Sequence, residues 1–139
     1  MIAMKTDRRT AARELAMQAL FQLDVQGSEL MGRLQRDFFG ETDCDDFVKQ
    51  LAMEWTQGTW SHVQDCDDLI TPAILRWEFS RLSPVDRSIL RLSVYQLRHC
   101  STIPPKVVIN EAIELAKKYS SEKSPGFING VLDAVLKKI

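Results

Sequence analysis

The chain has 139 residues, of which 45% are hydrophobic and 27% are charged, a composition that suits one compact domain with a core and excludes a disordered chain. Its formal net charge is −1, no apolar run approaches the roughly 20 residues that cross a bilayer, and no apolar stretch makes its basic start a signal peptide. Three cysteines without a C-x-x-C pair exclude a disulfide framework. We expect a cytoplasmic protein that does not use a membrane.

Charge is divided unevenly along the chain. Lys5, Arg8, Arg9 and Arg13 against Asp7 give the first 13 residues a charge of +3, so the remainder must carry −4 to reach the net charge of −1. A local basic patch binds phosphates through counterion release even where the whole protein is nearly neutral. The start of the chain therefore indicates a nucleic-acid partner.

Apolar residues recur at helical spacing through the first half of the chain. The first stripe predicts a helix from Thr10 to Val25, and a shorter helical segment follows from Ser28 to Phe39. The next helical region begins at Asp43 or Asp45 and extends to about Ile70. Gly58 interrupts it, which leaves one kinked helix and two separate helices both possible.

The second half of the chain has clearer helix starts. Thr71-Pro72 opens a further helical piece, and Ser83-Pro84 predicts a helix up to about His99, because serine suits the N-cap and proline the first helical position. Apolar residues cover more than half the circumference of this helix, so we expect it to be central. Pro104-Pro105 precedes a helix from Lys106 to Tyr119, and Ser124-Pro125 caps a last one. The sequence predicts an all-α fold of about seven helices.

Motifs of catalysis and of metal binding are absent from the sequence. It contains no glycine-rich phosphate loop, no G-x-S-x-G and no H-E-x-x-H. His62 and Cys66 are four residues apart, a spacing that suits two zinc ligands, but no second pair completes a site. We expect no catalytic residue, no metal and no cofactor, and we interpret this pair as structural.

The first helix carries candidate RNA contacts. Arg8 and Arg9 flank the apolar stripe, whereas Arg13 begins a second line that leads through Met17 to Phe21, outside the stripe. Arginines beside an aromatic ring suit single-stranded RNA, because arginine binds phosphate and the ring stacks on unpaired bases. Alternatively, the arginines only solvate the helix start and Phe21 packs under a loop. The helix dipole disfavours arginine at this end, which favours the functional interpretation.

Two further sets of residues have two interpretations each. Phe127 lies about 110° from the centre of the apolar face of its helix, so it either stacks on a base or covers the helix start. Arg87, Arg91 and Arg98 fall within about 40° of one another on the central helix. They either form ion pairs with the acidic segment 43–68, which we favour, or a docking face for a protein or RNA.

Four motifs occur in order along the chain. They begin at Arg8, Val85, Asn110 and Phe127, and they read RRTAARELAMQALF, VDRSILR, NEAIELAK and FINGVLD. Together they resemble the family of the bacterial transcription antitermination factor NusB. The resemblance covers nearly the whole chain and is weakest from Gly27 to about Leu75.

The resemblance implies a single all-helical RNA-binding domain over residues 1–139, built as two small packed helical bundles and without enzymatic activity. It implies binding to the boxA element of nascent ribosomal RNA together with the ribosomal protein NusE, in a complex that keeps RNA polymerase elongating through terminators. On this resemblance, the RNA surface would comprise Arg8, Arg9, Arg13 and the neighbouring start of the last helix around Phe127, and NusE would contact Asp86 and Arg91.

Two other functions remain open at this point. One is a helical scaffold that binds proteins and has no specific RNA recognition. The other is the RNA-contacting domain of a ribosomal-RNA cytosine methyltransferase, which requires a catalytic domain beyond Ile139. Thr10 and Ala11 stand where the family can have further basic residues, so we expect low RNA affinity without the partner. Joining two modest surfaces on one RNA would compensate for this.

Overall fold

The computed structural model describes residues 7–74 and 82–139, which form seven α-helices with short 3-10 and π segments and no strand. The predicted all-α fold is confirmed. None of the helices in these ranges is long and apolar enough to cross a membrane. The helices are α1 (Arg8–Gln26), α2 (Met31–Leu34), α3 (Asp46–Ser61), α4 (Val63–Ile70), α5 (Pro84–His99), α6 (Pro105–Tyr119) and α7 (Ser124–Leu136).

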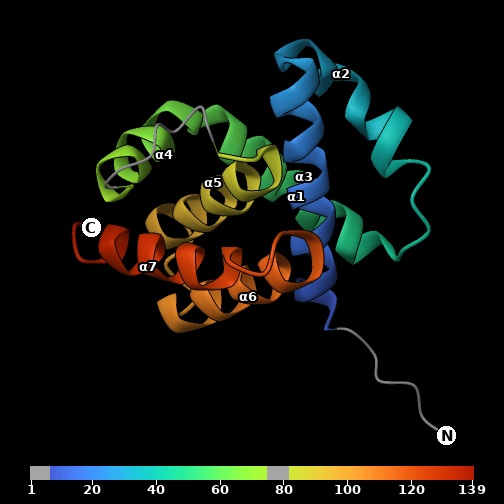
Figure 1. Ribbon diagram of the computed structural model, residues 1–139. Coiled ribbons are helices and arrows are strands. Elements are labelled where there is room, and N and C mark those ends of the chain that lie inside the picture. The colour runs from blue at the N-terminus through green and yellow to red at the C-terminus, as the bar shows by residue number, and fades with distance from the viewer. Residues whose placement is uncertain (1–6, 75–81) are drawn as a thin grey trace, which may run out of the picture.

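The helices pack as two small groups that meet where α1 contacts α5 (Figure 1). In the first group, α1 packs along α3, and the segment that contains the short α2 connects these two helices along the chain. In the second group, α6 and α7 pack against each other and against α5, and α4 lies against α5 as well. This arrangement agrees with the two packed bundles that the sequence resemblance implies.

Helix α5 is the centre of the molecule, as its apolar circumference predicts. The side chain of Ser83 caps it by accepting a hydrogen bond from the Asp86 backbone N–H at 3.1 Å, and Pro84 occupies the first turn. Because α5 contacts α1, α3, α4, α6 and α7, polar side chains such as Gln96 are also buried on it. Each of these needs a partner inside the protein.

Helix α1 begins two residues before the predicted Thr10. The carboxylate of Asp7 is the N-cap and accepts a hydrogen bond from the Arg9 backbone N–H at 2.8 Å. An acidic cap offsets part of the unfavourable interaction between the arginines and the helix dipole. The helix ends at Gly27, whose φ of +99° lies in the region that favours glycine.

The third helical region consists of two helices, one of the two alternatives that the sequence left open. The break lies at His62 and not at the predicted Gly58. The ring of His62 donates from Nδ1 to the carbonyl of Gly58 at 2.9 Å. Gly58 lies inside α3, where a Cβ atom would come within 2.1 Å of the Tyr95 hydroxyl oxygen. This glycine therefore permits the close approach of α5.

Two other predicted helix starts differ from the structure. Ser124 does not cap α7, because its buried hydroxyl donates to the carboxylate of Asp86 at 3.1 Å and ties α7 to α5 instead. The helical piece predicted to open at Thr71 is one 3-10 turn, Thr71–Ala73, and its continuation falls outside the described residues. The segment 28–39 is helical as predicted, with α2 between a 3-10 turn and a π segment.

Candidate nucleic-acid interface

Two arginines stand exposed at the start of α1. The side chain of Arg9 makes no hydrogen bond or ion pair with any described residue, and it borders a cleft of about 540 Å³ between the start of α1 and the loop before α6. Arg8 donates from Nε to the carboxylate of Asp45 at 3.1 Å. Its guanidinium carbon lies 4.5 Å from the ring centroid of Phe47. The predicted basic surface therefore exists at these two positions.

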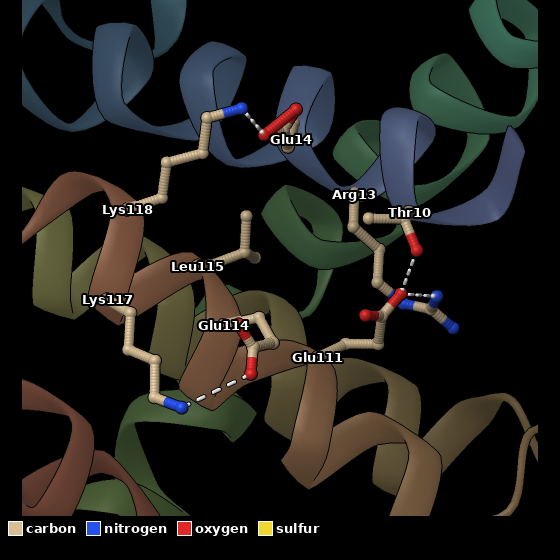
Figure 2. A pocket seen from close by; sticks show the side chains of 8 residues that line it. All are labelled: Thr10, Arg13, Glu14, Glu111, Glu114, Leu115, Lys117 and Lys118. Atoms are coloured by element: carbon tan, nitrogen blue, oxygen red, sulfur yellow. Dashed lines mark hydrogen bonds and ion pairs between the residues drawn. The ribbon is translucent and has the colours of Figure 1, made fainter. Parts of the chain in front are cut away.

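Arg13 lies inside the protein, with 3% of its surface exposed. Its guanidinium donates to Gln96 at 3.3 Å and to Glu111 at 2.9 Å, and it lies 5.0 Å from the ring of Trp55. Figure 2 shows Arg13 and Thr10 meeting the same oxygen of Glu111. Burial lowers the pKa of Arg13, and Glu111 opposes this shift. Arg13 therefore lies inside the protein and apart from the exposed arginines with which it is predicted to bind RNA.

The line from Arg13 to Phe21 is buried at its start and half-buried at its end. Met17 is 2% exposed, and Phe21 is half-buried beside a groove of about 330 Å³ that Phe38 and Tyr119 also line. Phe21 follows Arg9 by just over three helical turns, roughly 18 Å along α1. The structure therefore separates Phe21 from the exposed arginines, and its predicted role beside them in RNA binding lacks the required proximity.

Phe127 is half-buried and packs against the core at the start of α7. Helix α7 begins after the C-terminal end of α6, whereas Arg9 borders the same cleft as Pro104 and Val107 at the other end of α6. With 15 residues, α6 spans about 22 Å. Arg9 and Phe127 therefore lie toward opposite ends of α6, and the start of α7 is not the immediate neighbour of the arginines.

Asp86 and Arg91, the expected partner contacts, join helices to one another. Asp86 is 8% exposed, and its carboxylate accepts hydrogen bonds from the hydroxyls of Ser120 at 2.7 Å and Ser124 at 3.1 Å. Arg91 is 9% exposed and donates to both carboxylate oxygens of Asp67, each at 2.9 Å, and to Asp24.

The burial of Arg91 alone would lower its pKa, but the bonds with Asp67 and Asp24 outweigh this effect and raise the pKa. A guanidinium held in this way is a link between α1, α4 and α5. Arg87 adds to the same network through a 2.6 Å bond to Asp24. The charged group of Arg91 is thus engaged inside the protein, and the favoured interpretation of the arginine stripe as ion-paired with the acidic segment holds for Arg91.

The His62–Cys66 pair is packed among other side chains. The His62 ring lies 4.2 Å from the ring of His99 and 5.8 Å from that of Tyr95, measured between centroids. Cys66 is buried, and this burial raises the pKa of its thiol to about 12. No group of three or more histidine, cysteine, aspartate or glutamate side chains within residues 7–74 and 82–139 is arranged to hold a metal ion.

Sequence reasoning missed the partners of the arginines. The sequence predicts Asp45 only as a helix start, and Asp45 does cap α3 by accepting a 2.9 Å hydrogen bond from the Val48 backbone N–H. Nothing in the helical periodicity brings it or Phe47 to Arg8, 37 residues earlier than Asp45. Glu111 stands in one of the four family motifs, among apolar residues of its helix. A carboxylate in such a place is the signal in the sequence that a buried cation lies nearby.

Comparison with known proteins decides the family, because the family model described as NusB family matches residues 10–137. The chain belongs to the NusB family. It is 44% identical to the transcription antitermination protein NusB of Anaeromyxobacter dehalogenans (strain 2CP-1 / ATCC BAA-258), over 94% of this chain and 91% of that protein. It is 40% identical to the protein of the same name from Syntrophus aciditrophicus (strain SB), over 95% of this chain and 81% of that protein.

Solved NusB structures share this fold. A NusB structure from T. maritima superposes with a TM-score of 0.78 at 35% identity, over 97% of this chain and 94% of the other. A second similar chain comes from a crystal structure of the antitermination factors NusB and NusE in complex with dsRNA. That chain has a TM-score of 0.85 at 28% identity, over 95% of this chain and 98% of its own length. The relatives to which this chain is similar are thus named for transcription antitermination.

Proposed function

We propose that this protein is a transcription antitermination factor that binds the boxA element of nascent ribosomal RNA together with the ribosomal protein NusE. Bound in this way, it keeps RNA polymerase elongating through terminators, and it acts in the cytoplasm as a binding protein and not as an enzyme. The observation that supports the proposal is the similarity, over 95% of this chain, to a NusB solved together with NusE in complex with dsRNA. The exposed Arg8 and Arg9 supply a basic surface of the kind that this role needs.

The proposed RNA surface is smaller than the sequence suggests. With Arg13 buried, Arg8 and Arg9 are the two described arginines at the start of α1 that can reach phosphates. Two phosphate contacts on a single strand give a salt slope of only about −1.4, at −0.7 per contact. This chain alone should bind RNA weakly, and NusE should raise its affinity by holding the same RNA at a second surface.

We place NusE beside the start of α5, near the matching position Asp86. The half-buried Phe21 and Val85 line an apolar groove there, and apolar clefts with a few polar groups are typical of binding sites. In this proposal Asp86 and Arg91 do not touch NusE. The bonds of Asp86 join the start of α5 to the start of α7, and the bond of Arg91 joins the middle of α5 to α1, so that the groove keeps its shape.

The proposal is tested by titrating the protein with a boxA RNA, a scrambled RNA of the same composition and a duplex of the boxA sequence. Each titration is made at two salt concentrations, with and without NusE. We expect the single-stranded boxA RNA to bind more tightly than the scrambled strand, and NusE to widen this difference. Weak, sequence-independent binding in every titration would contradict the proposal and favour a protein-binding scaffold. Preference for the duplex would contradict the single-stranded mode.

A further inference from the structure

An exposed aromatic side chain lies next to the basic surface. Phe47, in the first turn of α3, is 43% exposed. Among the large apolar side chains that are exposed in the described residues, it is the one with an aromatic ring. The guanidinium carbon of Arg8 lies 4.5 Å from the centroid of its ring. A guanidinium at this distance is attracted by the ring electrons. The start of α1 and the start of α3 thus combine a cation and a ring at the protein surface.

Asp45 fixes the position of this cation. One oxygen of its carboxylate caps α3 by accepting from the Val48 backbone N–H at 2.9 Å, and the other accepts from Arg8 Nε at 3.1 Å. The two terminal nitrogens of Arg8 make no hydrogen bond with any residue in the described ranges. These nitrogens form the part of a guanidinium that binds phosphate in two-pronged geometry. Arg8 is therefore oriented, with its phosphate-binding end left open.

We propose that Arg8 and Phe47 form a nucleotide-binding site for single-stranded RNA, in which a base stacks on the Arg8–Phe47 pair and its phosphate binds the terminal nitrogens of Arg8. Unpaired bases stack on aromatic rings and on guanidinium planes, whereas bases inside a duplex do not present their faces. The site rests on the proposed function. It extends the RNA surface from α1 onto α3, about 100° around α1 from Arg9.

The charges around the ring select a base over the backbone. Asp43, Asp45 and Asp46 are exposed in the segment before and at the start of α3. Their carboxylates repel phosphate, a repulsion that the charge of Arg8 offsets at its own position, and they accept hydrogen bonds from the amino groups of bases. Arg8 could instead serve only to link α1 to α3 through its ion pair with Asp45. Such a link contributes little stability, because the side chains of Arg8 and Asp45 are 60% and 51% exposed.

Two conservative variants test the site in the full-length protein with NusE present. Phe47→Leu keeps an apolar side chain and removes the ring, and Arg8→Lys keeps the charge and removes the planar group. We expect each variant to bind the boxA RNA at least about fivefold more weakly, the lower range for loss of one stacked base. The double variant should lose little more than the weaker-binding single variant, because the two side chains act on one base.

Controls separate stacking from charge and from stability. Arg36→Lys makes the same exchange at another exposed ion pair, Arg36 with Asp37 at 2.9 Å, and should leave RNA affinity unchanged. RNAs with one abasic nucleotide at a time should reveal one position that matters to the unmodified protein and no longer matters to Phe47→Leu. Thermal unfolding of each variant shows whether the fold is retained.

The outcomes distinguish this site from the proposed function. If Phe47→Leu and Arg8→Lys retain the affinity of the unmodified protein, or lower only the melting temperature, the pair is a structural link and the inference is overturned. If abasic positions affect Phe47→Leu as they affect the unmodified protein, no base stacks on Phe47. An Arg9→Ala variant is measured in parallel. If Arg9→Ala also retains full RNA affinity, the whole proposed RNA surface at the start of α1 is contradicted. If Arg9→Ala binds RNA more weakly, the proposed function is retained and only the Arg8–Phe47 site is overturned.

Discussion

Arg9 and Arg13 are four residues apart on α1, yet the structure predicts opposite consequences when each is replaced by methionine. Methionine keeps much of the side-chain length and removes the charge and the hydrogen bonds. At Arg13 this leaves the carboxylate of Glu111 and the buried side-chain oxygen of Gln96 without the guanidinium that they bind. At Arg9 no described side chain loses a partner. The same substitution therefore tests an internal and an external role.

The size of the effect at Arg13 follows from its burial. Removing one partner of a buried ion pair costs about 3–5 kcal/mol of unfolding free energy. The side chain of Glu111 is 20% exposed, so water solvates part of the abandoned carboxylate, and we expect about 2–3 kcal/mol. For a chain of this size that corresponds to a fall in melting temperature of roughly 6–12 °C. Arg9→Met should stay within about 0.5 kcal/mol of the unmodified protein, as surface substitutions usually do.

Unfolding is followed by circular dichroism, and RNA binding is measured below the melting temperature of both variants. Arg9→Met should weaken RNA binding and reduce the magnitude of the salt slope by about 0.7, the share of one phosphate. Arg13→Met should keep the salt slope of the unmodified protein. Replacing both partners, in Arg13→Met with Glu111→Leu, should recover part of the lost stability, because apolar side chains can substitute for a buried pair. An Arg13→Met variant that is fully stable and has a reduced salt slope would refute the reasoning.

Three further substitutions have defined outcomes. Gly58→Ala should lower the free energy of unfolding by about 1–3 kcal/mol, because its Cβ would lie 2.1 Å from the Tyr95 hydroxyl oxygen. In a chain that already carries Tyr95→Ala, the same substitution should cost less. Equal melting temperatures of Gly58→Ala and the unmodified protein would contradict the packing argument. Val85→Glu should weaken binding to NusE in a pull-down titration while RNA affinity without NusE stays unchanged, since the charge enters the apolar groove; unaltered NusE binding would exclude that groove. His99 is exposed, but partial desolvation beside the His62 ring, followed by the charge of His62, lowers its pKa below the ordinary value of 6.5. The unfolded chain therefore binds more protons, and stability should fall slightly as the pH drops from about 6.5 through the folded-state pKa. His99→Gln should remove this part of the pH dependence of the melting temperature, and an unchanged dependence would contradict the assignment.

The helices could be predicted because their signals are local. Ser83 and Pro84 mark the start of α5 within four residues of sequence, and the structure shows the cap that they predict. Gly27 likewise ends α1 through its own backbone conformation. The break at His62 is harder to locate, because Gly58 is required by Tyr95 on another helix and not by the end of α3. Contacts between helices leave little trace in the pattern of a single helix.

The arginines show the same limit at the site. A wheel centred on one apolar stripe assumes that one face of α1 is covered, but α1 packs against α3 and α5 and its side chains also bond with α6. Arg13 therefore points inward to a carboxylate 98 residues away, a distance in sequence at which spacing carries no information. Arg8 and Arg9 could be predicted as exposed, since a helix start is seldom covered. Phe47 could not be placed beside Arg8 without the packing of α3 on α1.

In the proposed function, this protein recognises one RNA sequence, with NusE, through a surface at the start of α1. The most direct measurement is the ratio of dissociation constants for scrambled and boxA RNA in the presence of NusE, for the unmodified protein and for Arg9→Met. We expect the unmodified protein to prefer boxA RNA and Arg9→Met to bind both RNAs more weakly. Equal dissociation constants for the two RNAs, unaffected by the loss of Arg9, would contradict the account.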